Sequence, residues 1–353
     1  MHPESNPFRR HHRLDEDFRP RGCPNPDCPS RGGRAPFLWK RRGTFLREVD
    51  LRVVQRFKCL VCERGFSSQT FRLDYRYHRP RLHLALFLKL GDKCSLRQAA
   101  RELACHRDSL LLRLARMGPH ARWLNAAFLE EHLRRRGGLV GLFQLDELET
   151  FETDRRLFPV TVPVLIHAKS RFLVHSEPAT LPARGNLRPA DRRRLERAER
   201  KHGKRRNGSR AAVTACFRAL AAAVTGHGAV RVRTDEKASY PAILREVFAG
   251  RVVHETVNSR EPRGDTSRLF PINHTLAMLR DGLGRLVRRN WGHSKHRRNL
   301  GWHLAVWALY RNYVREWTNQ EQDRSSATEV GIVERRLTPD EVLEWTDRLP
   351  DVA

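Results

Sequence analysis

The sequence contains no apolar run close to the roughly 18 residues that a membrane-spanning helix requires. It also lacks a basic amphipathic helix with an aromatic face, so an anionic membrane is a poor candidate partner. The opening stretch MHPESNPFRRHHRLDEDFRPRG has no apolar segment of the kind found in signal peptides. These absences argue against membrane insertion and secretion, and they favour the cytoplasm, or the nucleoid if the partner is DNA.

Acidic residues are scarce relative to basic ones. The chain of 353 residues has 40 Asp and Glu against 68 Lys and Arg, which gives a formal net charge of +28 and a pI near 11.1. Charge of this size does not identify a fold, but it predicts an extended anionic partner, and nucleic acid is the leading candidate. The length allows one substantial core with small accessory modules.

Cysteine is also scarce, and the seven residues present are too few for a disulfide scaffold. Four of them form two close pairs on either side of a β-rich segment, Cys23 and Cys28 in CPNPDC and Cys59 and Cys62 in CLVC. This spacing predicts a zinc ribbon over residues 21–75 with a structural Zn²⁺, and the alternative is four unrelated cysteines. Because four thiolates fill the metal's coordination, we expect this module to support folding and docking rather than chemistry. The preceding residues, 1–20, are expected to form a disordered basic tail.

Two short helices are predicted within residues 76–120. Ser95 is a good N-cap with Gln98 three positions on, and residues 104–106 form a short break before a second apolar stripe. The pair resembles a DNA-binding helix-turn-helix, although an ordinary helical hairpin with a solvated basic face fits the same pattern. A linker helix is expected over residues 121–137. The second helix would present four side chains to a major groove, namely Arg107, Ser109, Arg113 and Arg116.

From residue 138 the pattern changes to strands. GLVGLFQLDEL, LFPVTVPVLIHA and SRFLVHSE are β-rich runs separated by short turns, which favours an antiparallel meander. Alternating helices and strands follow, in the order β-β-β-α-β-α-β-α. We therefore expect one α/β domain over residues 138–317.

Two segments stand apart by charge. Residues 184–210 hold twelve Lys and Arg against three acids, and residues 318–353 hold nine acids against four basic residues. The basic insertion is either a solvated helix or a phosphate contact surface, and its charge excess favours the second. The acidic tail is expected to be an appendage that folds back on basic surface, with a short helix starting at Thr338-Pro339. The candidate phosphate contacts in the insertion are Arg193, Arg194, Lys204 and Arg205.

Two aspartates mark strand ends. Asp146 follows an apolar run in FQLDELETF, and Asp235 follows another in AVRVRTD. Ends of adjacent strands converge, and carboxylate oxygens suit Mg²⁺ or Mn²⁺, which polarise a phosphate and activate water. Each Asp taken alone is more typical of a cap or a turn. Glu147 and Glu149 alternate away from Asp146 and are interpreted as solvated carboxylates or salt-bridge partners.

A zinc ribbon, a helix-turn-helix, then LDE, TDEKASY and NHTLAMLRDGLGRLVRRNW resemble the zinc-ribbon insertion-sequence transposases of the DDE, RNase H-like superfamily, over about residues 20–316. The resemblance implies an RNase H-like core, a mixed five-stranded sheet with flanking helices. It also implies that Asp146 and Asp235 hold the catalytic metals and that the activity is DNA cleavage and strand transfer. The implied partners are the element's terminal repeats, target DNA and a second copy of the chain, in a homodimer or a larger assembly.

The third metal ligand departs from the family pattern, because Asn273 stands where a Glu is usual near the start of the closing helix. An apolar stripe there comprises Leu276, Leu279, Leu283, Leu286 and Val287. On a helix, Asn273 falls about 90° from the centre of this stripe, and its rival Asp281 falls nearly opposite. The two are also separated by roughly 12 Å of helix rise, so they cannot bind one ion. Asn273 is the preferred ligand, with Glu261 and Asp265 left open.

The end of the closing region is strongly basic, and Arg288, Arg289 and Lys295 are expected to contact the DNA backbone. Two other functions compete with transposition. Asn273 favours a catalytically inactive DNA-binding regulator derived from a transposase, since an amide brings neither charge nor a base. A structure-specific nuclease on the same fold would cut DNA without joining it.

Overall fold

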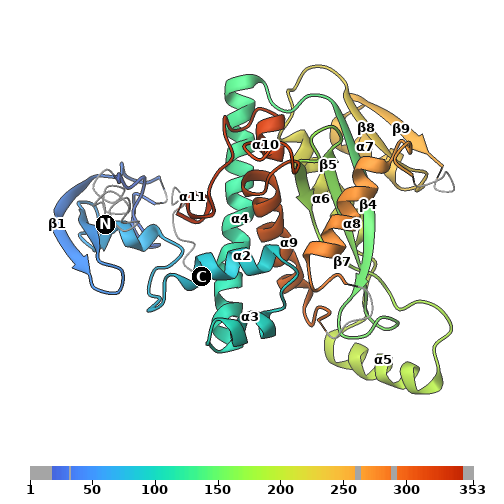
Figure 1. Cartoon of the computed structure of the whole chain (residues 1–353), viewed down its shortest axis with the longest axis horizontal. Coiled ribbons are helices and arrows are strands. Elements are labelled where there is room, and N and C mark those ends of the chain that lie inside the picture. The colour runs from blue at the N-terminus through green and yellow to red at the C-terminus, as the bar shows by residue number, and fades with distance from the viewer. Residues whose placement is uncertain (1–17, 32, 259–263, 288–291, 345–353) are drawn as a thin grey trace. The chain divides into compact units, whose positions relative to one another are not determined.

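The computed structural model describes residues 18–31, 33–258, 264–287 and 292–344 (Figure 1). The chain divides into two compact units, a small unit of residues 1–85 with 343–353 and a large unit of residues 86–342. Residues 1–17, most of the basic tail expected from the sequence, lie outside the described residues. Within the described part, no helix has the length and apolar character needed to cross a membrane.

The small unit is built on a three-stranded antiparallel sheet in the order β1-β2-β3. Side chains alternate across β2, so that Phe57 and Cys59 both point into a core that includes the aromatic rings of Phe66 and Phe71. The residues expected to form a zinc ribbon therefore fold as one compact β module. Its elements are β1 (Trp39–Arg47), β2 (Arg52–Cys59), β3 (Gly65–Ser67) and the 3₁₀ turn η2 (Ser68–Phe71).

A buried cluster of charged side chains also belongs to the small unit. Asp74 accepts hydrogen bonds from Arg47 Nη2 at 2.8 Å and from Arg72 Nε at 3.0 Å. Arg47 also pairs with Asp50, and Arg72 Nη2 lies 3.1 Å from Glu344 Oε1. Burial raises the pKa of Asp74, but the charges of Arg72 and Arg47 outweigh it and hold that pKa at about 2.

The large unit contains a mixed sheet whose main path runs β6-β5-β4-β8-β9, with β7 paired to β5. β4 and β5 are antiparallel, as are β5 and β6, which confirms the antiparallel meander. β4 and β8 are parallel, as are β8 and β9, so the unit is mixed α/β. The strands are β4 (Leu142–Phe151), β5 (Pro159–His167), β6 (Leu173–Ser176), β7 (Ala179–Thr180), β8 (Val230–Asp235) and β9 (Val252–Val257).

Helices cover both faces of this sheet. The helices in the order of the chain are α2 (Leu82–Gly91), α3 (Leu96–Glu102), α4 (Arg107–Arg136), α5 (Pro189–His202), α6 (Ser209–Ala221), α7 (Tyr240–Phe248), α8 (Phe270–Gly282) and α9 (Arg297–Leu309), followed by the π-helical turn η3 (Tyr310–Val314), α10 (Ser326–Glu329) and α11 (Pro339–Glu344). The boundary between the two units falls within α2. The order of strands and helices expected from residue 138 onward is confirmed, with β7 and α5 as additions.

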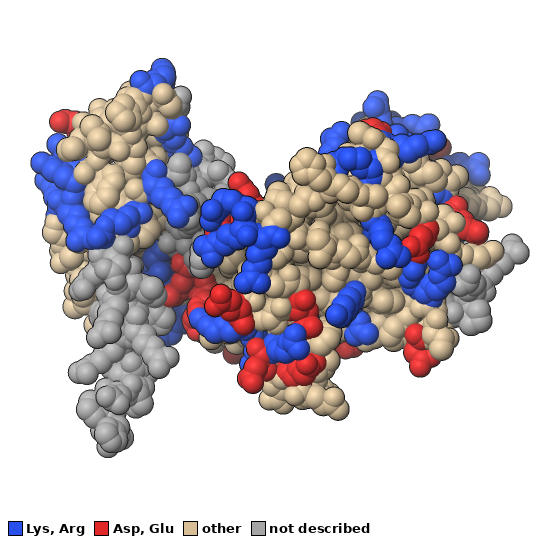
Figure 2. All heavy atoms as spheres, turned by 90° about the horizontal axis from the view of Figure 1, so that it is seen from above, with Lys and Arg blue, Asp and Glu red and all other residues tan. Residues whose placement is uncertain are grey.

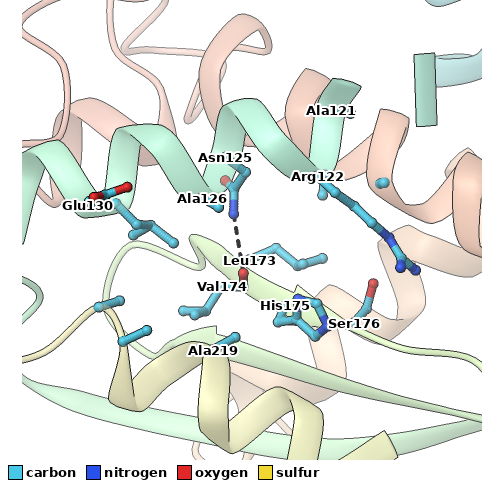
Figure 3. A pocket seen from close by; sticks show the side chains of 15 residues that line it. Ala121, Arg122, Asn125, Ala126, Glu130, Leu173, Val174, His175, Ser176 and Ala219 are labelled. Carbon is cyan, nitrogen blue, oxygen red and sulfur yellow. Dashed lines mark hydrogen bonds between the residues drawn. The ribbon is translucent and has the colours of Figure 1, made fainter. Parts of the chain in front are cut away.

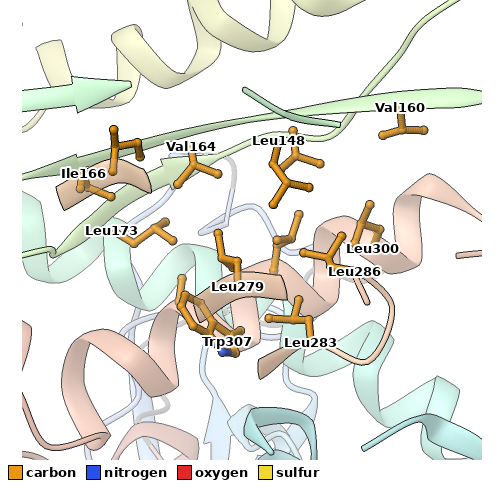
Figure 4. Close-up of a cluster of buried hydrophobic side chains, with 14 of the residues drawn as sticks. Leu148, Val160, Val164, Ile166, Leu173, Leu279, Leu283, Leu286, Leu300 and Trp307 are labelled. Carbon is orange, nitrogen blue, oxygen red and sulfur yellow. The ribbon is translucent and has the colours of Figure 1, made fainter. Parts of the chain in front are cut away.

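The main core lies between one face of the sheet and the helices α8 and α9. Every residue of β5 is buried, and its valines meet Leu148 of β4, Leu279 of α8 and Trp307 of α9 (Figure 4). A strand buried on both faces needs a nearly continuous apolar sequence, and PVTVPVLIH supplies it. This packing fixes α8 against β4.

The helices before the sheet differ from the expected helix-turn-helix in one respect. The cap is confirmed, because Ser95 Oγ accepts from the Gln98 amide and the Gln98 side chain accepts from the Ser95 amide. The second helix, however, does not stop at Gly118. It continues through Pro119 as the 30-residue α4, so the expected linker helix and second helix are one element. A Cβ at Gly118 would lie 2.5 Å from Trp302, so this glycine permits the close approach of α9 rather than ending α4.

The closing segment also differs from expectation. α8 ends at Gly282, and Leu283 is extended, so the stripe that was assigned to one helix continues beyond it in a turn. Leu279, Leu283 and Leu286 are nevertheless all buried in the main core. The short helix at Thr338-Pro339 is confirmed as α11, where Thr338 Oγ1 accepts from the Glu341 amide at 3.3 Å. Parts of the acidic tail are buried rather than appended, including Ala327 and Val342.

Candidate active site

Asp146 and Asp235 lie on neighbouring parallel strands. The expectation that Asp146 ends its strand is wrong. Asp146 lies in the middle of β4, two residues after the last pair with β8. That last pair is Gln144 with Arg233, so continuing the register by two residues brings Asp146 level with Asp235, the last residue of β8. The extended register therefore brings the backbone positions of the two aspartates level with each other, just beyond the last β4–β8 pair.

Both side chains belong to the face of the sheet that α8 covers. Gln144 Nε2 donates to the carbonyl of Arg268 at 2.7 Å, and Gln144 Oε1 accepts from the Ile272 amide at 3.1 Å. Arg233 of β8 donates to the same carbonyl at 3.1 Å. Because side chains alternate along a strand, Asp146 and Asp235, each two positions on, share this face.

Asn273 sits in the first turn of α8, one residue after the Ile272 amide that Gln144 holds. Its own amide donates to the Leu269 carbonyl at 3.0 Å, and its side chain is half-buried. Farther along α8, Arg280 donates to the Glu149 carbonyl at 3.3 Å, so the helix runs alongside β4 past Asp146. The first turn of α8 is thus fixed to the same strand that carries the first carboxylate.

The rival third ligands are less well placed. Asp281 is exposed and accepts from Lys93 Nζ at 2.8 Å, an interaction that lowers its pKa. Asp265 is exposed, and Glu261 lies outside the described residues. Of the described candidates, only Asn273 lies in the turn bound to Gln144.

Glu147 points to the opposite face and is the centre of a polar cluster. Its Oε2 accepts from Thr161 Oγ1 at 2.7 Å and from Ser209 Oγ at 2.9 Å. Its Oε1 accepts from the Tyr240 hydroxyl at 3.0 Å and pairs with Lys237 Nζ. Burial raises the pKa of Glu147, but the hydrogen bonds from Lys237 and Thr161 outweigh it, so the carboxylate is held ionised. The expected salt-bridge role is therefore correct for Glu147.

The Tyr240 hydroxyl lies in a buried and negatively charged environment. Its pKa is raised first by burial and then by the negative charges of Glu147, Asp235 and Asp146. Three carboxylates from two strands therefore act on one hydroxyl. Lys237, Tyr240 and Ser209 were not assigned from the sequence, although two of them lie in the TDEKASY stretch. Glu149, also interpreted as a salt-bridge partner, pairs with Arg184 at 2.6 Å.

The four cysteines of the small unit form a second candidate site. The sulfurs of Cys23, Cys28, Cys59 and Cys62 all lie within 4.8 Å of one another. Cys23 Sγ is 3.5 Å from Cys62 Sγ, and Cys28 Sγ is 3.8 Å from Cys59 Sγ. A tetrahedral Zn²⁺ with bonds of about 2.3 Å separates its sulfurs by about 3.8 Å, and a disulfide requires only about 2 Å. The four thiols fit a zinc ion and not two disulfides.

The side chains predicted to face a DNA major groove differ in their exposure. Arg107 and Arg116 are exposed and Ser109 is half-buried. Arg113 is buried, and its Nη1 donates to the Ser109 carbonyl at 3.0 Å, so the expectation that it points outward is wrong. It lies next to Leu114 on the apolar side of α4, where its long aliphatic stem packs. Arg107 is paired with Asp108 at 2.7 Å.

The basic insertion forms α5, none of whose residues is buried. Arg193 and Lys204 are exposed, and Arg194 pairs with Asp154 at 3.1 Å. Arg205 is structural rather than solvated, because it pairs with Glu152 at 2.8 Å and donates to two backbone carbonyls. Lys295 is exposed near the start of α9, while Arg288 and Arg289 lie outside the described residues.

The small unit has a basic surface that was not expected from the sequence. Lys40, Arg41 and Arg42 are consecutive exposed residues of the edge strand β1. Figure 2 shows Lys and Arg side chains gathered along the left-hand edge of this unit. The run WKRR was the available signal.

The large unit also has a cavity of about 530 Å³, which is distinct from the acidic site. α4, β6, α6 and α9 surround it, and alanine is the commonest residue in its walls, where Asn125 donates to the Val174 carbonyl at 3.2 Å (Figure 3). Asp146, Asp235 and Asn273 are not among its lining residues. The half-buried side chains of Asp146, Asp235 and Asn273 therefore lie apart from this cavity.

No protein-family model matches the sequence, and no curated protein does. Solved structures match at 13% identity. The catalytic domain of Mos1 mariner transposase covers 55% of this chain and 90% of its own length, with a TM-score of 0.21. The Mos1 mariner paired end complex with Mn covers 65% and 76%, with a TM-score of 0.20, and the Mos1 Strand Transfer Complex covers the same shares at 0.22. At these TM-scores the likeness carries no argument about the chemistry of this chain.

Proposed function

We propose that this protein is an insertion-sequence transposase with an RNase H-like core, which cleaves DNA at the ends of its element and joins them to target DNA. The observation that supports this most is the placement of Asp146 and Asp235. They lie level on adjacent parallel strands and share the face covered by α8. The mixed sheet with helices on both faces agrees with the fold that the sequence resemblance implies.

Asp146, Asp235 and the Asn273 amide oxygen would hold Mg²⁺ or Mn²⁺ in this proposal. Oxygen ligands of this kind fit these ions. When bound, the metal supplies Lewis-acid activation of the phosphodiester and of the attacking hydroxyl group. Asn273 contributes orientation without charge, since its amide can neither neutralise the ion nor accept a proton as a base.

The DNA partner is supported by the net charge and by exposed basic side chains on both units. Arg116 on α4, Arg193 and Lys204 around α5, and Lys295 before α9 remain candidates for phosphate contacts. Joining two element ends requires both to be held together, so we propose a dimer or larger assembly on DNA. The four-cysteine cluster would hold a structural Zn²⁺ that folds the small unit.

The test is cleavage and joining of a linear DNA fragment that carries the gene with its native flanks, in the presence of Mg²⁺ and a supercoiled plasmid target. We expect the parent protein to cut at the element ends and to form joined products. Asp146→Asn and Asp235→Asn should abolish both products while binding of flank DNA persists. Glu149→Gln is the matched control, because Glu149 is an exposed carboxylate on the same strand that faces away from the site.

Asn273 supports one competing function, a regulator that binds DNA without cutting it. Binding of the flanks with no cleavage by the parent protein, in either Mg²⁺ or Mn²⁺, would establish the regulator and refute the transposase. Cutting without joined products would instead identify a nuclease.

A further inference from the structure

A continuous chain of bonds joins the two candidate metal ligands. The Glu147 amide donates to Asp146 Oδ1 at 2.7 Å, and the Glu147 carboxylate pairs with Lys237 Nζ. The Lys237 amide in turn donates to Asp235 Oδ1 at 3.3 Å. Lys237 therefore contacts Asp235 directly, through its backbone amide, and reaches Asp146 through Glu147, with which its side chain pairs.

The middle of the chain is buried and held by several elements. The Glu147 side chain is 11% exposed, and its oxygens also accept hydrogen bonds from Thr161 of β5, Ser209 of α6 and Tyr240 of α7. Lys237 Nζ donates a second hydrogen bond to Ser209 Oγ at 2.8 Å. Each polar group in this cluster is satisfied, which makes the cluster rigid and specific in geometry.

Such a pair is not needed for stability alone. The Lys237 side chain is 38% exposed and that of Glu147 is 11% exposed, and such a partly exposed ion pair contributes little net stability. Glu147 is also on the wrong face of β4 to bind the same ion as Asp146. The pair instead joins β4 to the segment after β8, just beyond the last β4–β8 pair of Gln144 with Arg233.

We propose that the Glu147–Lys237 ion pair sets the separation and orientation of Asp146 and Asp235, which makes Lys237 a positioning residue for the divalent-metal site. This inference rests on the proposed function. Without Lys237, the Tyr240 hydrogen bond to Glu147 is left to join the segment after β8 to β4, and the charge of Glu147 next to Asp146 is no longer balanced by the lysine. The metal site should then lose affinity although both of its carboxylate ligands are intact.

The experiment measures Mn²⁺ binding to full-length, zinc-loaded protein by electron paramagnetic resonance of free Mn²⁺. Asp146→Asn identifies the binding that belongs to this site. We expect Lys237→Met to raise the Kd for Mn²⁺ about tenfold or more, which is the usual effect of removing a group that orients a metal ligand. Lys237→Arg should recover most of the affinity, because it restores the charge. Arg184→Met is the matched control, since it removes the exposed partner of Glu149 on the same strand and should leave the Kd unchanged.

Thermal melting of each variant separates positioning from folding. A lower melting temperature with an unchanged Kd for Lys237→Met would show a purely structural role and overturn the inference. If Lys237→Met does not fold, Tyr240→Phe removes one hydrogen bond to Glu147 and should raise the Kd severalfold, and an unchanged Kd there would also overturn it. If the parent protein and Asp146→Asn bind Mn²⁺ equally, the proposed metal site itself is wrong, which is a different failure.

Discussion

Replacing Asp74 by Asn tests the charged cluster of the small unit quantitatively. Asp74 is 6% exposed, and it accepts hydrogen bonds from Arg47 and Arg72. Its pKa falls from an ordinary 3.8 to about 2, because the two guanidinium charges outweigh the effect of burial. At about 1.36 kcal/mol per pKa unit, this shift is worth about 2 kcal/mol at neutral pH.

Breaking a buried ion pair commonly lowers the free energy of unfolding by about 3–5 kcal/mol when it leaves one charge without a partner. Here neither arginine is stranded. Arg47 keeps Asp50, and Arg72 keeps Glu344 at 3.1 Å. The smaller figure is therefore the expected one.

Hydrogen exchange of the β2 amides in the full-length protein measures the effect. Asp74→Asn should speed their exchange roughly 30-fold at pH 7, the equivalent of about 2 kcal/mol. Because the pKa of Asp74 is lowered in the folded state, its contribution is complete above the unfolded pKa and is lost as the pH falls through about 2. The difference between parent and variant should thus shrink to about half near pH 3. Asp27→Asn, at an exposed position of the same unit, is the control. Exchange in Asp74→Asn within about threefold of the parent at pH 7 would refute this account of the cluster.

Three further predictions address the two candidate metal sites and the core. Removing zinc with a chelator should make the small unit sensitive to trypsin while the large unit stays resistant, because binding of structural zinc contributes about 10–16 kcal/mol to folding in small domains; survival of the small unit after verified zinc loss would contradict the four-cysteine site. Leu279→Ala should lower the free energy of unfolding of the large unit by about 2–5 kcal/mol in chemical denaturation, whereas Leu112→Ala, which is 61% exposed, should cost much less. Asn273→Asp should tighten Mn²⁺ binding, since it adds a negatively charged ligand; an unchanged Kd would show that residue 273 does not contact the ion.

Features encoded over short distances were predictable from the sequence. The cap at Ser95 needs only Gln98 three residues on, and the sulfurs of the two cysteine pairs gather around one centre as their spacing indicated. The alternation in β4 and the continuous apolar run of β5 likewise gave the meander. Each of these signals is contained within a few neighbouring residues, or in two such segments joined by a short hairpin.

Features that depend on distant contacts were not predictable. Gly118-Pro119 has the composition of a helix end, yet α4 continues because Gly118 lies against Trp302 of α9. The stripe from Leu276 to Leu286 has helical spacing, yet α8 ends at Gly282, where a Cβ would lie 2.5 Å from Trp307 Nε1. In both cases the local sequence permits two outcomes, and packing against α9 decides between them.

The three carboxylates of LDELE illustrate why an acidic run can lie within a strand in so basic a protein. Alternation in β4 sends Asp146 to the α8 face and Glu147 to the face of α6 and α7. Glu147 is neutralised by Lys237 and by three hydroxyl donors, whereas Asp146 is left level with a second carboxylate, Asp235. Two adjacent residues thus have different surroundings, since Glu147 is paired with Lys237 and Asp146 lies level with Asp235, where the divalent cation is proposed to bind. Because the same lysine bonds to Glu147 and to Asp235, the protein's own ion pair shapes the place where the cation is proposed to bind.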